Sequence, residues 1–186
     1  MRALIPLSEL LVLTSESEAS LSGTGADPLT FRSVDYRTES KRGCSWVEPV
    51  VVGNDVIYVQ REGCVVRSIV STEATTTRKR YVANEMTMFV DHLLAGSGRT
   101  IVDMAYCQHP YSTIWFVLSD GKVLTLSYIP EIKQMSWAQH DLGGWVESVT
   151  SVYNGTEDVP WFTVVRGAVR QIERLATRQI TTLANG

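Results

Sequence analysis

The stretch STIWFVLSDGKVLTLSY, residues 112–128, decides the fold because it has the pattern of a β-hairpin. An apolar run from Ile114 to Leu118 is followed by Asp120-Gly121, and apolar residues then return. Asp-Gly between two apolar runs is a strong hairpin signal, because glycine adopts the positive φ of a tight turn without steric cost. The stretch therefore predicts two antiparallel strands joined at Gly121.

The same hairpin pattern recurs along the chain. An apolar or aromatic pair is followed, five residues after its second member, by a glycine in three places: Tyr58 and Gly63, Phe116 and Gly121, and Phe162 and Gly167. A weaker fourth copy begins at Leu11 and has Ser17 in the glycine position, so that the turn positions are 46, 58 and 46 residues apart. We interpret the three glycines as structural turn residues of four hairpin units, about 1–45, 46–98, 99–143 and 144–186.

The spacing of these units predicts an all-β fold. Hairpin repeats of roughly 40–50 residues are typical of β-propellers, in which each small sheet packs on its neighbours. We expect a β-propeller-like repeat, with a β-sandwich as the alternative, in one β domain that is part of a longer protein. One short helix is expected near residues 84–95, where Met88, Phe89 and Leu93 share a helical face and Gly96 can end it.

Composition argues against several classes of function. The net charge is −3, so the chain has no overall basic field with which to hold nucleic acid. The short run Arg78-Lys79-Arg80 is interpreted as part of a solvated loop rather than as a nucleic-acid contact. The three cysteines have no Cys-x-x-Cys spacing, so neither a disulfide framework nor a zinc site is expected. No segment has the ~20 apolar residues that span a bilayer, so no membrane span is expected.

No catalytic, cofactor-binding or metal-binding residue is predicted. The three histidines, His92, His109 and His140, lack the spacing of a metal site. No Gly-x-Ser-x-Gly elbow is present, and no pattern pairs two carboxylates across a glycosidase cleft. Two of the five tryptophans, Trp115 and Trp161, recur at the same position of the repeat, which favours packing between repeats over a ligand platform.

Several longer segments of the sequence resemble those of a known protein family. They are VEPVVVGNDVIYVQ at 47–60, GRTIVDMAY at 98–106, TIWFVLSDGKVLTLSY at 113–128 and a Trp…His-Asp…Val-Glu-Ser-Val segment at 137–149. Together they resemble the large tail or head–tail structural proteins of bacteriophages and prophages, a family that includes tail-tube and nozzle-like proteins. The resemblance rests on structural residues and supplies no catalytic motif.

The resemblance implies a non-enzymatic component of the virion, located in the tail or head–tail region and made in the cytoplasm of the bacterial host. Its expected partners are other virion proteins and further copies of itself, with proximity to DNA but no specific DNA contact. Two other classes stay open. A carbohydrate-binding or glycan-cleaving tail module would present exposed tryptophans beside paired carboxylates. A peptide-binding propeller scaffold would close its ring within these residues.

Overall fold

The computed structural model describes residues 1–24, 28–72, 80–132 and 134–177. Within these ranges the regular structure is fifteen β-strands and three short 3-10 helices, η1 (Asp91–Leu93), η2 (Ala95–Ser97) and η3 (Pro130–Ile132). The prediction of an all-β fold is therefore confirmed. Arg78 and Lys79 of the predicted basic loop lie outside the described residues.

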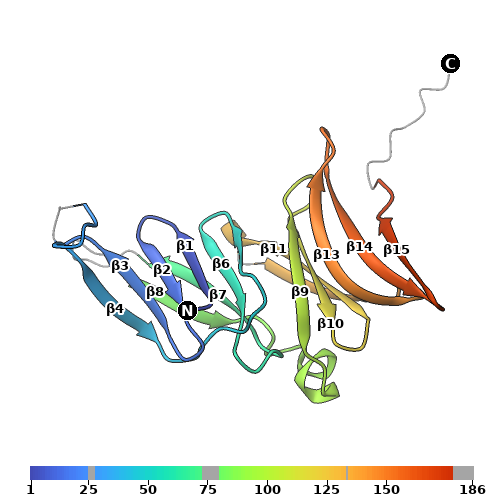
Figure 1. The fold of residues 1–186 in the computed structure, drawn as a ribbon, viewed down its shortest axis with the longest axis horizontal. Coiled ribbons are helices and arrows are strands. Elements are labelled where there is room, and N and C mark those ends of the chain that lie inside the picture. The colour runs from blue at the N-terminus through green and yellow to red at the C-terminus, as the bar shows by residue number, and fades with distance from the viewer. Residues whose placement is uncertain (25–27, 73–79, 133, 178–186) are drawn as a thin grey trace.

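The strands form four antiparallel sheets, each built from consecutive strands (Figure 1). Sheet 1 contains β1 (Ala3–Pro6), β2 (Leu10–Leu13), β3 (Glu18–Ser22) and β4 (Asp35–Ser40). Sheet 2 contains β5 (Val50–Val52), β6 (Asp55–Val59), β7 (Val66–Thr72) and β8 (Arg80–Glu85). Sheet 3 contains β9 (Ile101–Cys107), β10 (Thr113–Leu118), β11 (Val123–Ile129) and β12 (Gln134–His140). Sheet 4 contains β13 (Trp145–Tyr153), β14 (Asp158–Arg166) and β15 (Val169–Arg174), so each of the four units of the sequence holds one sheet.

The hairpin at residues 112–128 forms the middle of sheet 3. Strands β10 and β11 pair in register, with Phe116 opposite Leu124, and the Gly121 N–H donates to the Leu118 carbonyl oxygen at 2.9 Å. Gly121 has φ +76°, and the corresponding turn residues Gly63 and Gly167 have φ +82° and +61°. Glycine at these three positions lets the chain reverse within a tight turn, because other residues rarely adopt such φ values.

The sheets pack face to face in chain order, and each contact has its own apolar cluster. Residues such as Leu11 and Leu13 of sheet 1 pack on Tyr58 of sheet 2. The largest cluster joins sheets 2 and 3, and a third joins sheets 3 and 4. In Figure 1 the sheets accordingly follow one another along the long axis of the molecule. Sheet 1 lies at one end and sheet 4 at the other.

The two residues of each repeated pair point to opposite faces of their sheet, in the same order in each sheet. We call the face of a sheet that points to the next sheet its leading face, and the opposite face its trailing face. The first members of two pairs, Ile57 and Trp115, lie on leading faces, in contact with sheets 3 and 4. The second members Tyr58, Phe116 and Phe162 lie on trailing faces, in the cluster with the preceding sheet. This order follows from strand geometry, because successive side chains point to opposite faces.

The predicted helix near residues 84–95 is wrong. Asn84 and Glu85 end strand β8, where they pair with β7, and the chain then makes the two short 3-10 helices η1 and η2. Met86 and Leu94 are buried in the cluster between sheets 2 and 3, whereas Phe89 is 86% exposed. Met86 and Leu94 therefore fill the gap between the sheets at single points, and the apolar residues of the segment do not form one buried helical stripe.

Four separate sheets are not the two-layer sandwich that was the alternative expectation. Among the described residues, no apolar cluster joins sheet 1 to sheet 4. Sheet 4 has three described strands, where the other sheets have four. The described part of the chain is thus an open row of sheets, and a closed propeller stays a prediction.

Candidate functional site

The most enclosed charged group lies between sheets 1 and 2. Glu18, on β3, is 2% exposed, and its carboxylate accepts hydrogen bonds from three groups. The Tyr58 hydroxyl donates to Oε1 at 3.1 Å, the Ser40 hydroxyl donates to Oε2, and the Arg42 backbone N–H donates to Oε2 at 3.4 Å. Burying a carboxylate is costly unless such donors replace its water, so this set explains how the charge is held.

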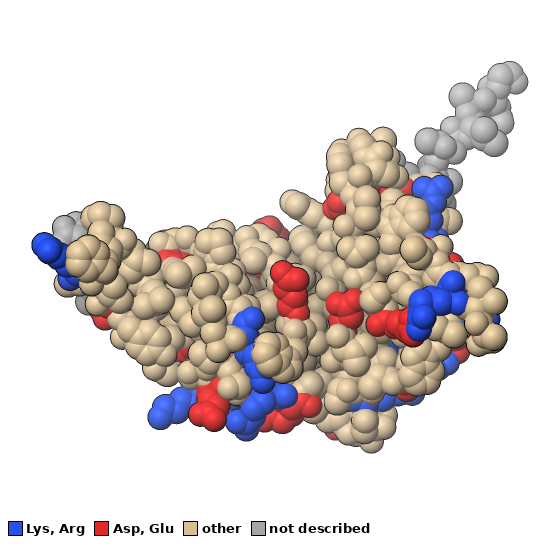
Figure 2. Space-filling model, viewed as in Figure 1, with Lys and Arg blue, Asp and Glu red and all other residues tan. Residues whose placement is uncertain are grey.

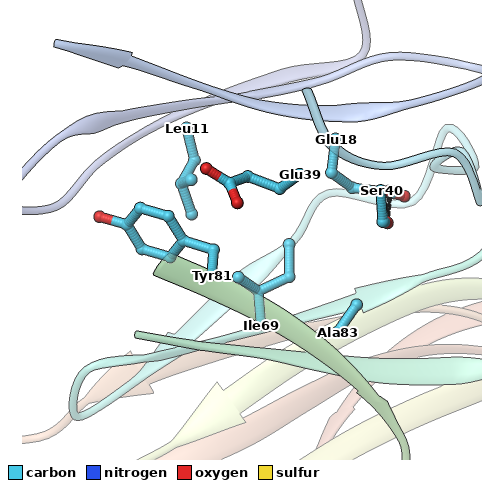
Figure 3. A pocket seen from close by; sticks show the side chains of 7 residues that line it. All are labelled: Leu11, Glu18, Glu39, Ser40, Ile69, Tyr81 and Ala83. Carbon is cyan, nitrogen blue, oxygen red and sulfur yellow. Dashed lines mark hydrogen bonds between the residues drawn. The ribbon is translucent and has the colours of Figure 1, made fainter. Parts of the chain in front are cut away.

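A second carboxylate, Glu39, lines the same small cavity (Figure 3). Glu39 accepts a hydrogen bond from the Ser20 hydroxyl at 2.9 Å and lies 3.6 Å from the Arg37 Nε. The cavity holds about 10 Å³, which is space for about one water molecule. Although two carboxylates meet here, the cavity is far too small for a sugar or a peptide, so the arrangement is structural.

The other two sheet contacts repeat this polar arrangement. Between sheets 2 and 3, the Tyr128 hydroxyl donates to Asp55 Oδ2 at 2.7 Å. Between sheets 3 and 4, the Val149 backbone N–H donates to Asp103 Oδ2 at 2.9 Å. At each of the three contacts one such bond has its carboxylate on the earlier sheet and its donor on the later one, although Asp158 of sheet 4 also accepts from backbone groups after β9. The contacts are therefore polar as well as apolar.

Burial changes the acidity of the groups at these contacts. Burial, and then the negative charge of Glu18, raise the pKa of Tyr58 above its ordinary value. Burial, followed by the hydrogen bond to Asp55, raises the pKa of Tyr128. The same two influences as at Tyr58, burial first, raise the pKa of the Cys44 thiol to about 12. Burial also raises the pKa of Asp103, against the effect of its two backbone donors.

The raised pKa values predict a loss of stability in alkali. The unfolded chain releases the Cys44 proton near pH 9.0 and the tyrosine protons near pH 10.0, whereas the folded chain retains them to higher pH. Since the folded state then binds more protons, the free energy of unfolding falls as pH rises above 9. We expect it to be lower at pH 10.5 than at pH 8 by about 1–3 kcal/mol, measured by urea unfolding with a reducing agent present.

Tyr58→Phe supplies the control for this pH dependence. The variant is expected to be less stable at pH 8, because the Glu18 carboxylate loses a buried donor. Its further loss of stability between pH 8 and pH 10.5 should be smaller than that of the native chain, because one titrating group is gone. An equal or larger loss would contradict the assignment of the pH effect to Tyr58.

A larger hollow lies between the outer parts of sheets 2 and 3. This groove, of about 870 Å³, is lined by the turn 53–55, by β7 and β8, and by Tyr128, Pro130 and Met135. Its volume is in the range of ligand sites. However, Asp55 accepts from Tyr128, and Glu85 is paired with Arg67 at 3.1 Å. These two acidic groups therefore already stabilise the fold.

The structure does not bring the histidines together as a metal site. His92 is in η1, His109 follows β9, and His140 ends β12, where its Nε2 lies 2.9 Å from the Thr125 hydroxyl. Within the described residues, no group of three or more His, Cys, Asp or Glu side chains is arranged to hold a metal ion.

Several carboxylates in loops and near strand ends have structural partners. Asp158 accepts the backbone N–H groups of Gln108 and His109, both at 2.8 Å, and so ties sheet 4 to the end of β9. Asp141 pairs with Lys122. Glu147 makes a two-pronged contact with Arg170, whose Nη2 lies 2.8 Å from Glu147 Oε1.

The tryptophans differ widely in how far their side chains are exposed. Trp115 is 3% exposed and packs edge-on against Phe162, with ring centroids 5.4 Å apart. Trp46 is 80% exposed, and the Arg2 guanidinium lies over its ring at 3.5 Å from the centroid. Trp161, at the repeat position equivalent to Trp115, is only half-buried.

Sequence reasoning missed the carboxylates at the sheet contacts, which are the buried Glu18 and Asp55 and the half-buried Asp103. Asp55 follows Gly53-Asn54 in a turn-forming stretch, and Glu18 ends a polar run, so neither has the pattern of a buried site. The one available signal was a carboxylate inside or beside a predicted apolar strand, as in Ile101-Val102-Asp103-Met104. A buried charge on a strand calls for a partner, but the sequence does not name that partner.

The face of the molecule seen in Figure 2 shows no basic patch of the kind that binds nucleic acid. Figure 2 shows acidic and basic side chains intermixed on the face viewed, without a broad basic area. None of the described helices is long or apolar enough to cross a membrane. No model of a known protein family matches the chain, and no curated protein matches it either.

Proposed function

We propose that this chain is a non-enzymatic structural component of a bacteriophage tail or head–tail assembly, and that it acts through protein–protein packing. The single observation that supports the proposal best is the repeated sheet-to-sheet contact, which three times combines an apolar cluster with a hydrogen bond to a carboxylate. Such contacts suit a building block, because each sheet presents a surface shaped for another sheet.

The distribution of charged groups supports the non-enzymatic part of the proposal. A glycan hydrolase needs two carboxylates about 5–10 Å apart that face a cleft open to substrate. The two carboxylates that meet here, Glu18 and Glu39, line a cavity for about one water and accept hydrogen bonds from the fold itself. The resemblance of four sequence segments to tail and head–tail proteins supplies the viral context of the proposal.

The second candidate function is a peptide-binding scaffold, and the groove between sheets 2 and 3 favours it. The groove combines apolar side chains such as Val70 and Met135 with the carboxylate of Glu131. This lining suits an extended peptide with apolar and basic residues.

The proposal is tested on virus particles. Particles from a host that carries the gene would be purified on a density gradient, and antibodies against the chain would be located by immunogold microscopy. We expect label at the tail or at the head–tail junction, and incomplete particles when the gene is deleted. Complete, infectious particles that lack the chain would contradict the proposal.

A further inference from the structure

Two sheet faces at the ends of the row have no sheet on them among the described residues. At one end is the trailing face of sheet 1, which displays Leu4 and Tyr36, 48% and 54% exposed, beside the half-buried Leu10 and Leu21. At the other end is the leading face of sheet 4. There Ile172 is 75% exposed, and its neighbours Trp161 and Val165 are half-buried.

The repeat position of Trp161 indicates that the leading face of sheet 4 is suited to packing against another sheet. Trp161 is the first member of a repeated pair, and the first members Ile57 and Trp115 are 0% and 3% exposed because the next sheet covers them. Its neighbour Phe162 packs on sheet 3, so Trp161 must point the other way, to the leading face of sheet 4. The residue type thus fits a covered position, yet the described chain supplies no cover.

The trailing face of sheet 1 carries residues at the repeat positions that, in the later sheets, pack on the preceding sheet. Val12 holds the place in the repeat that Tyr58, Phe116 and Phe162 hold in the later sheets, where each packs on the preceding sheet. Val12 pairs with the exposed Leu4 across β1 and β2. Tyr36, on the same face, adds a phenol, the group that donates to the preceding sheet at two of the three internal contacts.

We propose that two copies of this chain associate head to tail, with the leading face of sheet 4 in one copy packed on the trailing face of sheet 1 in the other. This proposal rests on the proposed structural function and names the surface through which it acts. Each copy offers the half of the contact that the other lacks, and the new contact continues the three internal ones. Because the two faces differ, the contact is heterologous, so it generates rings or open chains of copies.

A two-fold arrangement, in which like faces meet, fits the surfaces less well. Two leading faces of sheet 4 would bring together the guanidinium groups of Arg174, which lies on that face opposite Trp161, whereas Arg170 on the same face is already paired with Glu147. Two trailing faces of sheet 1 would pair the tyrosines without the acceptor on the opposing sheet that the internal contacts provide. Head-to-tail packing places neither the Arg174 guanidinium nor the tyrosine against its own kind.

The test uses two variants that each block one face. Trp161→Glu places a charge on the leading face of sheet 4, and Leu4→Glu places one on the trailing face of sheet 1. Phe89→Glu is the matched control, because Phe89 is 86% exposed on a loop outside both faces. Association of the chain is measured by sedimentation velocity over a range of concentrations, after circular dichroism has shown that each variant keeps its β-structure.

We expect the native chain and Phe89→Glu to associate equally, and each blocked variant to associate at least tenfold more weakly. The decisive result is a mixture of the two blocked variants. Each retains one intact face, so the mixture should form a one-to-one complex that neither variant forms alone. Self-association of either blocked variant at native strength would overturn the proposal, since it would mean that like faces meet. A native chain that stays monomeric, or a mixture that does not associate, would overturn it too.

The outcome is separable from that of the particle experiment. Association in solution without the chain in particles would contradict the proposed function and leave the head-to-tail contact standing. Presence in particles with no association of native chains would overturn the head-to-tail contact alone. In that case the end faces would be covered by other proteins.

Discussion

Replacing Trp115 by alanine is expected to lower the free energy of unfolding by about 3–5 kcal/mol. The indole is 3% exposed between sheets 3 and 4 and contacts Phe162 across that interface. Its removal leaves a cavity that neighbouring strands cannot close without breaking their pairing. Trp115→Phe should cost less, because the ring remains and the buried Trp115 Nε1 has no hydrogen-bond partner among the described residues.

Trp161→Ala is the matched control, since it makes the same chemical change at the equivalent position of the last sheet. We expect a loss of about 1 kcal/mol, because no following sheet covers this side chain and no closed cavity is created. Both variants are compared with the native chain by urea unfolding, at a dilution where the chain is monomeric. Equal losses at the two positions would contradict the idea that the next sheet determines the cost.

Replacing Gly121 by alanine is expected to lower the free energy of unfolding by about 2–5 kcal/mol, since two costs add. The backbone has φ +76°, which other residues adopt at a cost. An added Cβ would also lie 2.7 Å from Cδ2 of Trp145 and 3.0 Å from its Cα, so the start of β13 would have to shift. The turn of sheet 3 and the first strand of sheet 4 would therefore be disturbed together.

Gly167→Ala separates these two costs. Gly167 also has a positive φ, +61°, but nothing lies within 4 Å of an added Cβ. Only the backbone term remains, and we expect a loss of about 1–2 kcal/mol. Thermal unfolding followed by circular dichroism would compare the two variants. A loss at Gly167 as large as that at Gly121 would mean that the contact with Trp145 is not the cause.

The hairpins and the alternation within them are the part of the fold that the sequence predicted well. The pairs at Ile57 and Trp115 are adjacent residues on strands, so their division between two sheet faces follows from strand geometry alone. The segment near residues 84–95 was mispredicted for a physical reason. Met88 and Phe89 of the expected helical stripe are 65% and 86% exposed, so their spacing imitates a helical period without a buried face behind it.

The buried carboxylates were beyond sequence reasoning because their partners are distant in the chain. Glu18 and Tyr58 are 40 residues apart, and Asp55 and Tyr128 are 73 residues apart. Local pattern predicts which strands form hairpins, but the packing of one sheet on another decides which polar groups meet. Whether the sheets close into a ring depends on small angles between them, which no residue pattern encodes directly.

The placement of the buried carboxylates Glu18 and Asp55 on the earlier sheet of their contacts has a consequence for synthesis. Strands pair only with their neighbours in sequence and sheets pack in chain order, so each sheet can form as it leaves the ribosome. The nascent first sheet then exposes Glu18 to water, and the charge is enclosed only when β6 arrives with the Tyr58 hydroxyl. Asp55 is likewise enclosed only when β11 brings the Tyr128 hydroxyl, so neither carboxylate has to be held unpaired in an apolar interior while the chain grows from its N-terminus.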